Sequence, residues 1–173
     1  MSPSPSYRDA VPADGPALAA TGRRVFADTF GAAFDPADMA LHLDRKFGPA
    51  GLPAELGDPA IRIRLAEAEG CILAYVKLAP MALPLEHPAG ALEIKQFYVL
   101  APWQGMGVAA ELMHWVLATA RTEGAPALFL SVWEHGARAI AFYRRHGFVT
   151  VGKAPFLLGT RTYSDPVMRL DLI

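Results

Sequence analysis

The sequence predicts a single domain of the α/β class (α+β mixed), with a central mixed, mostly antiparallel sheet flanked by helices. Its length of 173 residues fits one domain, which we expect to span residues 1–173 with a frayed tail at 1–6. Apolar residues make up 53% of the chain and charged residues 19%, which supplies a core and excludes a disordered chain. The predicted elements include a strand hairpin followed by the order strand, helix, strand, helix, strand, strand.

The first half of the chain predicts a short strand, two helices and a hairpin. We expect the strand at residues 7–11 and the first helix at about 16–29, with Asp14 and Gly15 at its cap. The second helix begins with Asp35 as its cap and Pro36 in its first position, and it ends before Gly48. Alternating residues at 61–65 predict a half-buried strand, and residues 70–78 predict its partner.

The second half predicts strands that alternate with helices. Residues 92–100 form a strand, and a helix follows Gly105 to about residue 123 because apolar residues recur there at helical spacing. The apolar run 127–133 predicts a strand that is buried on both faces and parallel to its predecessor. A helix at about 137–146 and two closing strands at 148–158 and 166–172 complete the order.

Composition excludes several classes of protein. The formal net charge of −1 gives no basic surplus for binding nucleic acid. One cysteine, Cys71, and five scattered histidines predict neither a disulfide framework nor a metal site. The most apolar stretch, 71–85, is interrupted by Lys77, Pro80 and Pro84, so we expect no membrane span. The polar, proline-rich start lacks signal-peptide character, and we therefore expect a cytoplasmic protein.

The strongest local motif is Gln104-Gly-Met-Gly-Val-Ala109, which follows a predicted strand and opens a helix. Its glycines and the helix dipole suit a phosphate or pyrophosphate, although a glycine-rich turn could simply reverse the chain. A P-loop is excluded because Val108 and Ala109 stand where Lys and Ser or Thr are needed. A dinucleotide fold is disfavoured because too few strand–helix units follow the motif.

Two longer stretches resemble one family. Leu92-Glu-Ile-Lys-Gln-Phe-Tyr-Val-Leu-Ala-Pro-Trp-Gln-Gly-Met-Gly-Val-Ala109 is similar to the acetyl-CoA motif of the GNAT superfamily of N-acetyltransferases. Leu130-Ser-Val-Trp-Glu-His-Gly-Ala-Arg-Ala-Ile-Ala-Phe-Tyr-Arg-Arg-His-Gly-Phe148 resembles the second motif of that family. Residues 26–30, the start of the second helix and residues 165–168 resemble the bacterial Pai-type spermidine/spermine acetyltransferases.

The resemblance implies where acetyl-CoA binds. In this family a parallel strand pair splays apart and pantetheine lies between the strands, so the main chain of Phe97 and Val99 would pair with its amides. Backbone N–H groups of the glycine loop would hold the pyrophosphate, while arginines of the next helix, including Arg144, could reach the CoA phosphates. The expected cofactor-binding residues are Phe97, Tyr98, Val99, Gln104, Gly105, Met106, Gly107, Val108, Ala109, Arg138 and Arg145. We expect no metal.

The resemblance also suggests catalytic groups. Glu93 in the first motif is the candidate base, or alternatively a strand carboxylate paired with Lys95. Tyr143 matches the tyrosine that protonates the departing thiolate in many members, although a core aromatic is the other interpretation. One departure from the family is Gly136, where asparagine is common, so any side-chain contact from that position is lost.

The resulting functional hypothesis is an acetyl-CoA-dependent N-acetyltransferase that acts by direct attack in a ternary complex. Its acceptor is a primary amine of a small molecule, with a polyamine as one candidate. A protein or peptide N-acetyltransferase and a non-catalytic CoA-binding regulatory domain are the alternatives. A homodimer is expected only by analogy with the family.

Overall fold

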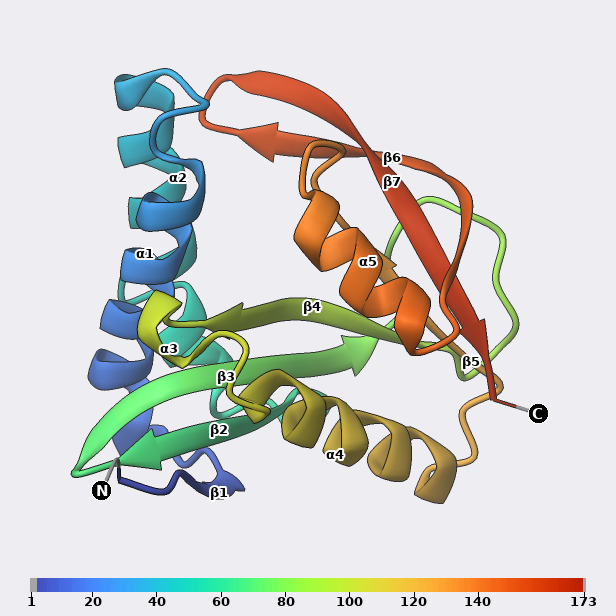
Figure 1. Cartoon of the computed structure of the whole chain (residues 1–173). Coiled ribbons are helices and arrows are strands. Elements are labelled where there is room, and N and C mark those ends of the chain that lie inside the picture. Colours follow the sequence, from blue (N-terminus) through green and yellow to red (C-terminus); the bar gives the residue numbers. More distant parts are fainter. Residues whose placement is uncertain (1–2, 173) are drawn as a thin grey trace.

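A seven-stranded sheet forms the centre of the chain in the computed structural model, which describes residues 3–172 (Figure 1). The strand order is β1-β2-β3-β4-β5-β7-β6, and β4 and β5 are the parallel pair. The elements are β1 (Ser6–Asp9), η1 (Pro12–Asp14), α1 (Gly15–Phe30), α2 (Pro36–Phe47), α3 (Leu52–Glu55), β2 (Arg62–Ala68), β3 (Cys71–Pro80), β4 (Leu92–Val99), η2 (Ala101–Trp103), α4 (Val108–Thr122), β5 (Ala127–Ser131), α5 (Ala137–Arg145), β6 (Val149–Leu158) and β7 (Arg161–Asp171). The predicted mixed, mostly antiparallel sheet is confirmed.

Helices cover both faces of the sheet. The apolar residues of α4 and α5 pack with Leu78, Ile94 and Met168 in the largest core cluster. Helices α1, α2 and α3 pack on the opposite face, around Leu65 and Tyr75. We call these the α4/α5 face and the α1/α2 face. In Figure 1, α4 and α5 lie in front of the sheet, while α1 and α2 stand together at its side.

Local sequence signals explain the starts and ends of several elements. The Asp35 side chain accepts hydrogen bonds from the N–H groups of Ala37 and Asp38, which confirms the predicted cap of α2. Asp14 makes no cap bond to α1, because its carboxylate is bound elsewhere. The four residues of α3 were not predicted, since so short a helix shows no apolar period.

Several strand boundaries differ from the prediction: β1 ends at Asp9 rather than at residue 11, β2 extends to Ala68 rather than ending at 65, and β5 ends at Ser131 rather than at 133. Ser6, expected in the frayed tail, already pairs with Glu67 in β1; Met1 and Ser2 lie outside the described residues. Strand β7 begins at Arg161 rather than at Pro166. Pro166 fits inside this strand because its carbonyl points towards β5, where it accepts a hydrogen bond from the Val132 N–H. The N–H that proline lacks would point the same way, and the paired part of β5 has ended there, so no sheet hydrogen bond is lost.

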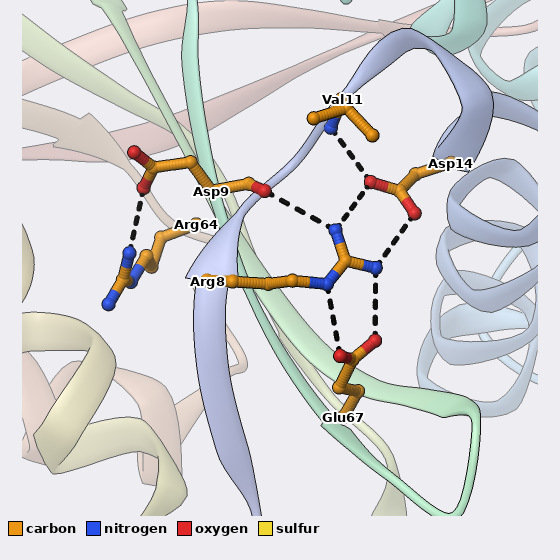
Figure 2. A network of polar contacts seen from close by, with 6 residues as sticks. All are labelled: Arg8, Asp9, Val11, Asp14, Arg64 and Glu67. Atoms are coloured by element: carbon orange, nitrogen blue, oxygen red, sulfur yellow. Dashed lines mark hydrogen bonds and ion pairs between the residues drawn. The ribbon is translucent and has the colours of Figure 1, made fainter.

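An arginine joins the N-terminal strand to its surroundings (Figure 2). The Arg8 guanidinium donates two bonds to the Asp14 carboxylate, at 2.8 and 2.9 Å, and two to Glu67, both at 3.0 Å. Asp14 also accepts a bond from the Val11 N–H, and Arg8 holds the pKa of Asp14 below its usual value. This network connects β1, η1 and β2, and it explains why Asp14 does not cap α1.

The tip of the β6–β7 hairpin is bound to α2, as Figure 1 shows near the top of the fold. Asp38 in the first turn of α2 accepts hydrogen bonds from the Thr160 N–H and hydroxyl, both at 2.7 Å. Gly159 has a φ of +61°, and a Cβ there would overlap the Cα of Asp38. The hairpin therefore depends on a glycine at its tip.

Among residues 3–172, no helix is long and apolar enough to cross a membrane.

Candidate active site

Strands β4 and β5 separate after only three paired residues. Their register runs from Leu92↔Leu128 to Ile94↔Leu130, and β4 then continues to Val99 without β5. The separation follows directly on a bulge in β4, where Lys95 has no opposite residue in β3. The predicted parallel pair is therefore splayed towards the C-terminal end of β4.

The open edge of β4 presents the main chain of Phe97 and Val99. Leu100 donates its N–H to Leu73 of β3, so by the alternation of a strand the groups of residues 97 and 99 point away from β3. They point into the gap left by β5. The carbonyl of Val99 accepts a bond from the Gln104 side-chain amide at 3.0 Å, which leaves the Phe97 groups and the Val99 N–H facing the gap.

The glycine loop directly follows this edge and opens α4. Gly105 and Gly107 have φ angles of +78° and +84°, the left-handed region that favours glycine. An added Cβ at Gly107 would meet nothing within 4 Å, so the loop faces open space there. Val108 is buried beneath the loop, whereas Met106 is exposed. The backbone N–H groups of residues 107–109 thus stand at the N-terminus of a fifteen-residue helix, where an anion is stabilised.

Arg138 in the first turn of α5 reaches the same loop. Its guanidinium donates to the side-chain amide oxygen (Oε1) of Gln104 at 2.9 Å, and its second terminal nitrogen lies 3.7 Å from the position of a Cβ on Gly105. Arg145 stands seven residues later on α5, about 10 Å further along the axis. The structure brings Gln104, Gly105 and Arg138 together, but it does not bring Arg145 to the loop.

Tyr143 reaches the splay from α5 on the α4/α5 face. Its side chain packs edge-on against Phe97, at 6.3 Å between ring centroids, and against Phe142 and Phe148. Burial raises the pKa of Tyr143, so its hydroxyl stays protonated at neutral pH. No hydrogen bond to this hydroxyl comes from the side chains or backbone of residues 3–172.

Tyr98 approaches the splay from the opposite face. Its ring packs with Tyr75 and Phe26, and burial raises its pKa, with a further contribution from Tyr143. Next to it, the Tyr75 hydroxyl donates to the Gln96 amide oxygen at 2.9 Å. Tyr98 and Tyr143 therefore flank the gap between β4 and β5 from opposite faces of the sheet.

Glu93 lies in the part of β4 that is still paired with β5. Its carboxylate is 4% exposed, accepts a bond from the Ala82 N–H at 3.0 Å and pairs with the Lys95 ammonium at 2.9 Å. The predicted pairing of Glu93 with Lys95 is present. Lys95, at the bulge, lies between this carboxylate and the open end of the strand.

These features match one family over most of the chain. Residues 22–148 match the family model described as the acetyltransferase (GNAT) family. The chain belongs to the GNAT family. It is an acetyl-CoA-dependent N-acetyltransferase, and the resemblance carried by the two sequence motifs is confirmed.

Similar proteins support the assignment at two levels. An "Uncharacterized N-acetyltransferase" of Mycobacterium bovis is 33% identical over 92% of this chain and 99% of its own length. An aminoalkylphosphonate N-acetyltransferase of Salmonella typhimurium is 33% identical over 57% of this chain and 63% of its own. The PaiA N-acetyltransferase of Thermoplasma acidophilum, solved in complex with coenzyme A, has the same fold with a TM-score of 0.80, 16% identity and coverage of 97% of this chain and 99% of its own.

Two features of the site could not be recognised in the sequence: the contact between Gln104 and Arg138, and the burial of Asp165. The bridge between Gln104 and Arg138 spans 34 positions, and no local pattern indicates that they meet. Asp165 is a nearly buried carboxylate of β7 that appeared in the sequence only within a stretch resembling other members. No group of His, Cys, Asp or Glu within residues 3–172 is placed to hold a metal ion.

Proposed function

We propose that this GNAT enzyme acetylates a primary amine of a small cationic molecule, of the polyamine class, by direct attack in a ternary complex. The observation that carries the proposal is the open edge of β4, flanked by the glycine loop at one end and by Tyr143 beside Phe97. This edge offers main-chain pairing to an extended chain, and the loop offers N–H groups to the pyrophosphate that follows it.

Each element of the site has a part in binding acetyl-CoA. The main chain of Phe97 and Val99 pairs with the pantetheine amides, and Tyr98 borders the path from the α1/α2 face. The loop residues Gly105, Met106, Gly107, Val108 and Ala109 present their N–H groups to the pyrophosphate, with Gln104 at the entry. Arg138 is already at the loop and adds a positive charge. Arg145 is exposed further along α5 and serves a phosphate outside the loop.

The acceptor approaches from the α1/α2 face. With the phosphates at the glycine loop and the sulfur beside Tyr143, acetyl-CoA would lie on the side of α4 and α5, which leaves the opposite face for the amine. Lys95 at the bulge and the buried side chain of Gln96 lie on β4 where the two strands begin to separate. An amine that enters here meets the thioester carbonyl across the splay.

The reaction needs one proton removed and one proton supplied. A primary amine with a pKa near 10.4 is almost entirely protonated at neutral pH, so it must lose a proton before its nitrogen attacks the carbonyl carbon. Glu93 is the proposed base, and because it is paired with Lys95 it takes the proton through water. As the bond from carbon to sulfur breaks, Tyr143 donates its proton to the thiolate.

A small acceptor suits this site better than a protein chain. The hairpin tip is fixed to α2 by Asp38, and the aromatic side chains Phe30, Phe34, Trp133 and Tyr163 pack together below it. A folded protein segment would have to displace these contacts.

We further propose that the enzyme acts in the cytoplasm. The exposed Val149 and Val151 of the edge strand β6 support a homodimer.

Thiol release from acetyl-CoA tests the function. We expect release that depends on an added amine, with polyamines preferred over amino acids and peptides. Gly107→Asp places a negative charge where N–H groups face the pyrophosphate, and it should weaken acetyl-CoA binding at least about tenfold. Gly124→Asp is the matched control, because Gly124 has a φ of +71° and equally open space at the other end of α4. Binding of CoA without turnover of any acceptor would exclude the proposed reaction.

A further inference from the structure

Asp165 of β7 is a buried carboxylate that lacks a side-chain partner. The residue is 6% exposed, and within residues 3–172 no lysine or arginine forms an ion pair with it. The backbone N–H of Glu134 faces its carboxylate and favours the charged form. Burial raises the pKa of Asp165, the Glu134 carboxylate adds to this, and His135 nearby opposes it. A buried carboxylate with so few partners costs free energy, and a bound cation would offset that cost.

The side chain of Asp165 points to the α1/α2 face of the sheet. Tyr163 packs in the cluster formed with α1 and α2, whereas Met168 packs in the cluster formed with α4 and α5. Side chains alternate along a strand, so Asp165 lies on the same face as Tyr163. This is the face from which the acceptor enters.

Four aromatic side chains cluster on the same face of the sheet as Asp165. Trp133 directly precedes Glu134, and its ring meets Phe30 edge-on at 5.4 Å between centroids. Phe34, in the connection between α1 and α2, meets Trp133 at 6.1 Å and Tyr163 at 5.0 Å. We call Phe30, Phe34, Trp133 and Tyr163 the aromatic wall. All four are partly exposed, so their ring surfaces remain available to a cation.

Two of the three lysines on this face are neutralised by carboxylates. Lys77 of β3 pairs with Glu55 of α3 at 2.5 Å, and Lys95 of β4 pairs with Glu93 at 2.9 Å. The remaining lysine, Lys46 in the last turn of α2, is exposed. The buried charge left without an opposite charge is therefore negative, which favours a cationic acceptor over an anionic one.

We propose that Asp165 and the aromatic wall bind a second ammonium group of the acceptor and so select diamines over monoamines. The reacting amine lies at the splay between β4 and β5, and β7 is the next strand after β5. Adjacent strands are about 5 Å apart, and Asp165 lies two residues beyond the last β5–β7 pair, Ser131↔Val167, so we expect a chain of several methylene groups beyond the reacting amine to reach it. This inference rests on the proposed function, because it specifies the acceptor of that same reaction.

Acceptor kinetics test the proposal with putrescine, n-butylamine and γ-aminobutyrate, which are of similar length and end in a cation, a methyl group and a carboxylate. With the wild-type enzyme we expect kcat/KM for putrescine to exceed that for either of the others at least about tenfold. Asp165→Asn should lower the ratio of putrescine to n-butylamine at least about fivefold, mainly through KM for putrescine. Glu134→Gln removes an equal charge from an exposed neighbour and should leave this ratio within about twofold.

The outcomes separate this inference from the proposed function. Acetylation of n-butylamine as efficiently as putrescine by the wild-type enzyme would overturn the diamine subsite while leaving the transferase intact, and this comparison needs no variant to fold. A ratio that is unchanged in Asp165→Asn, or that falls equally in Glu134→Gln, would also overturn it. Failure to acetylate any amine would refute the proposed function instead, and the inference with it.

Discussion

At the scale of single residues, burial determines what Tyr143 can do. Burial disfavours the charged phenolate and so raises the pKa of the Tyr143 hydroxyl above that of an exposed tyrosine. The hydroxyl remains a donor over the whole neutral range. The thiolate of CoA has an ordinary pKa near 8.5, which makes it a fair leaving group even without an acid. A moderate effect on rate therefore follows.

Tyr143→Phe keeps the ring and its contacts with Phe97 and Phe148 while it removes the proton donor. We expect kcat to fall about a hundredfold, the lower end for loss of a general acid, with acetyl-CoA affinity and thermal stability nearly unchanged. Single-turnover acetyl transfer measures the chemical step. Tyr7→Phe, in β1 away from the site, controls for the loss of a hydroxyl from a partly buried tyrosine. A wild-type rate in the Tyr143 variant would assign this residue to the core alone.

At the scale of elements, the β6–β7 hairpin and α2 form one unit above the acceptor face. Asp38 accepts two hydrogen bonds from Thr160, and these bonds hold the pKa of Asp38 below its usual value. The contact joins residues 122 positions apart. It fixes the strand that carries Tyr163 and Asp165 relative to the helix pair that carries Phe30.

Gly159→Ala should separate the hairpin from α2. An added Cβ would overlap the backbone of Asp38, and the φ of +61° adds strain. We expect a loss of about 2 kcal/mol or more in the free energy of unfolding and a higher KM for the acceptor, with acetyl-CoA affinity retained. Gly70→Ala is the matched control, since its φ is +75° and nothing lies within 4 Å, so it should cost only about 1 kcal/mol. Equal losses in denaturant unfolding would refute the close contact.

At the scale of the whole molecule, the sequence predicts what depends on neighbours along the chain. The apolar period of α4, the cap of α2 and the glycine loop are local, and all are present. Contacts that depend on the fold could not be predicted: Arg8 binds Asp14 and Glu67 together, so Asp14 does not cap α1, and Gln104 meets Arg138. Asp165 was missed because Pro166 suggested the start of a strand, whereas β7 begins five residues earlier. Burial of a side chain by several elements is decided only by the fold.

His42 shows how such burial affects the stability of the whole chain. The residue is 4% exposed, and its ring lies between those of Phe26 of α1 and Phe156 of β6, at 4.5 and 5.5 Å between ring centroids. Burial, followed by the charges of Lys46 and Arg45, lowers the pKa of His42 to about 4. The imidazole is therefore neutral in the folded protein.

Stability should fall as the pH is lowered from the ordinary histidine pKa near 6.5 to about 4. In this interval the unfolded chain takes up a proton that folded His42 refuses, so acid favours unfolding. His42→Gln cannot titrate and keeps a polar side chain at this position. We expect wild-type protein to lose about 2 kcal/mol more than this variant between pH 7 and about 4.5, after allowance for solvent screening. Urea unfolding at both pH values measures the difference, and the exposed His114→Gln should behave as wild type. Asp14 and Asp38, whose pKa values are lowered, lose their contributions only below their ordinary value of 3.8, equally in all three proteins. Parallel losses in wild type and His42→Gln would show that His42 is protonated normally in the folded state.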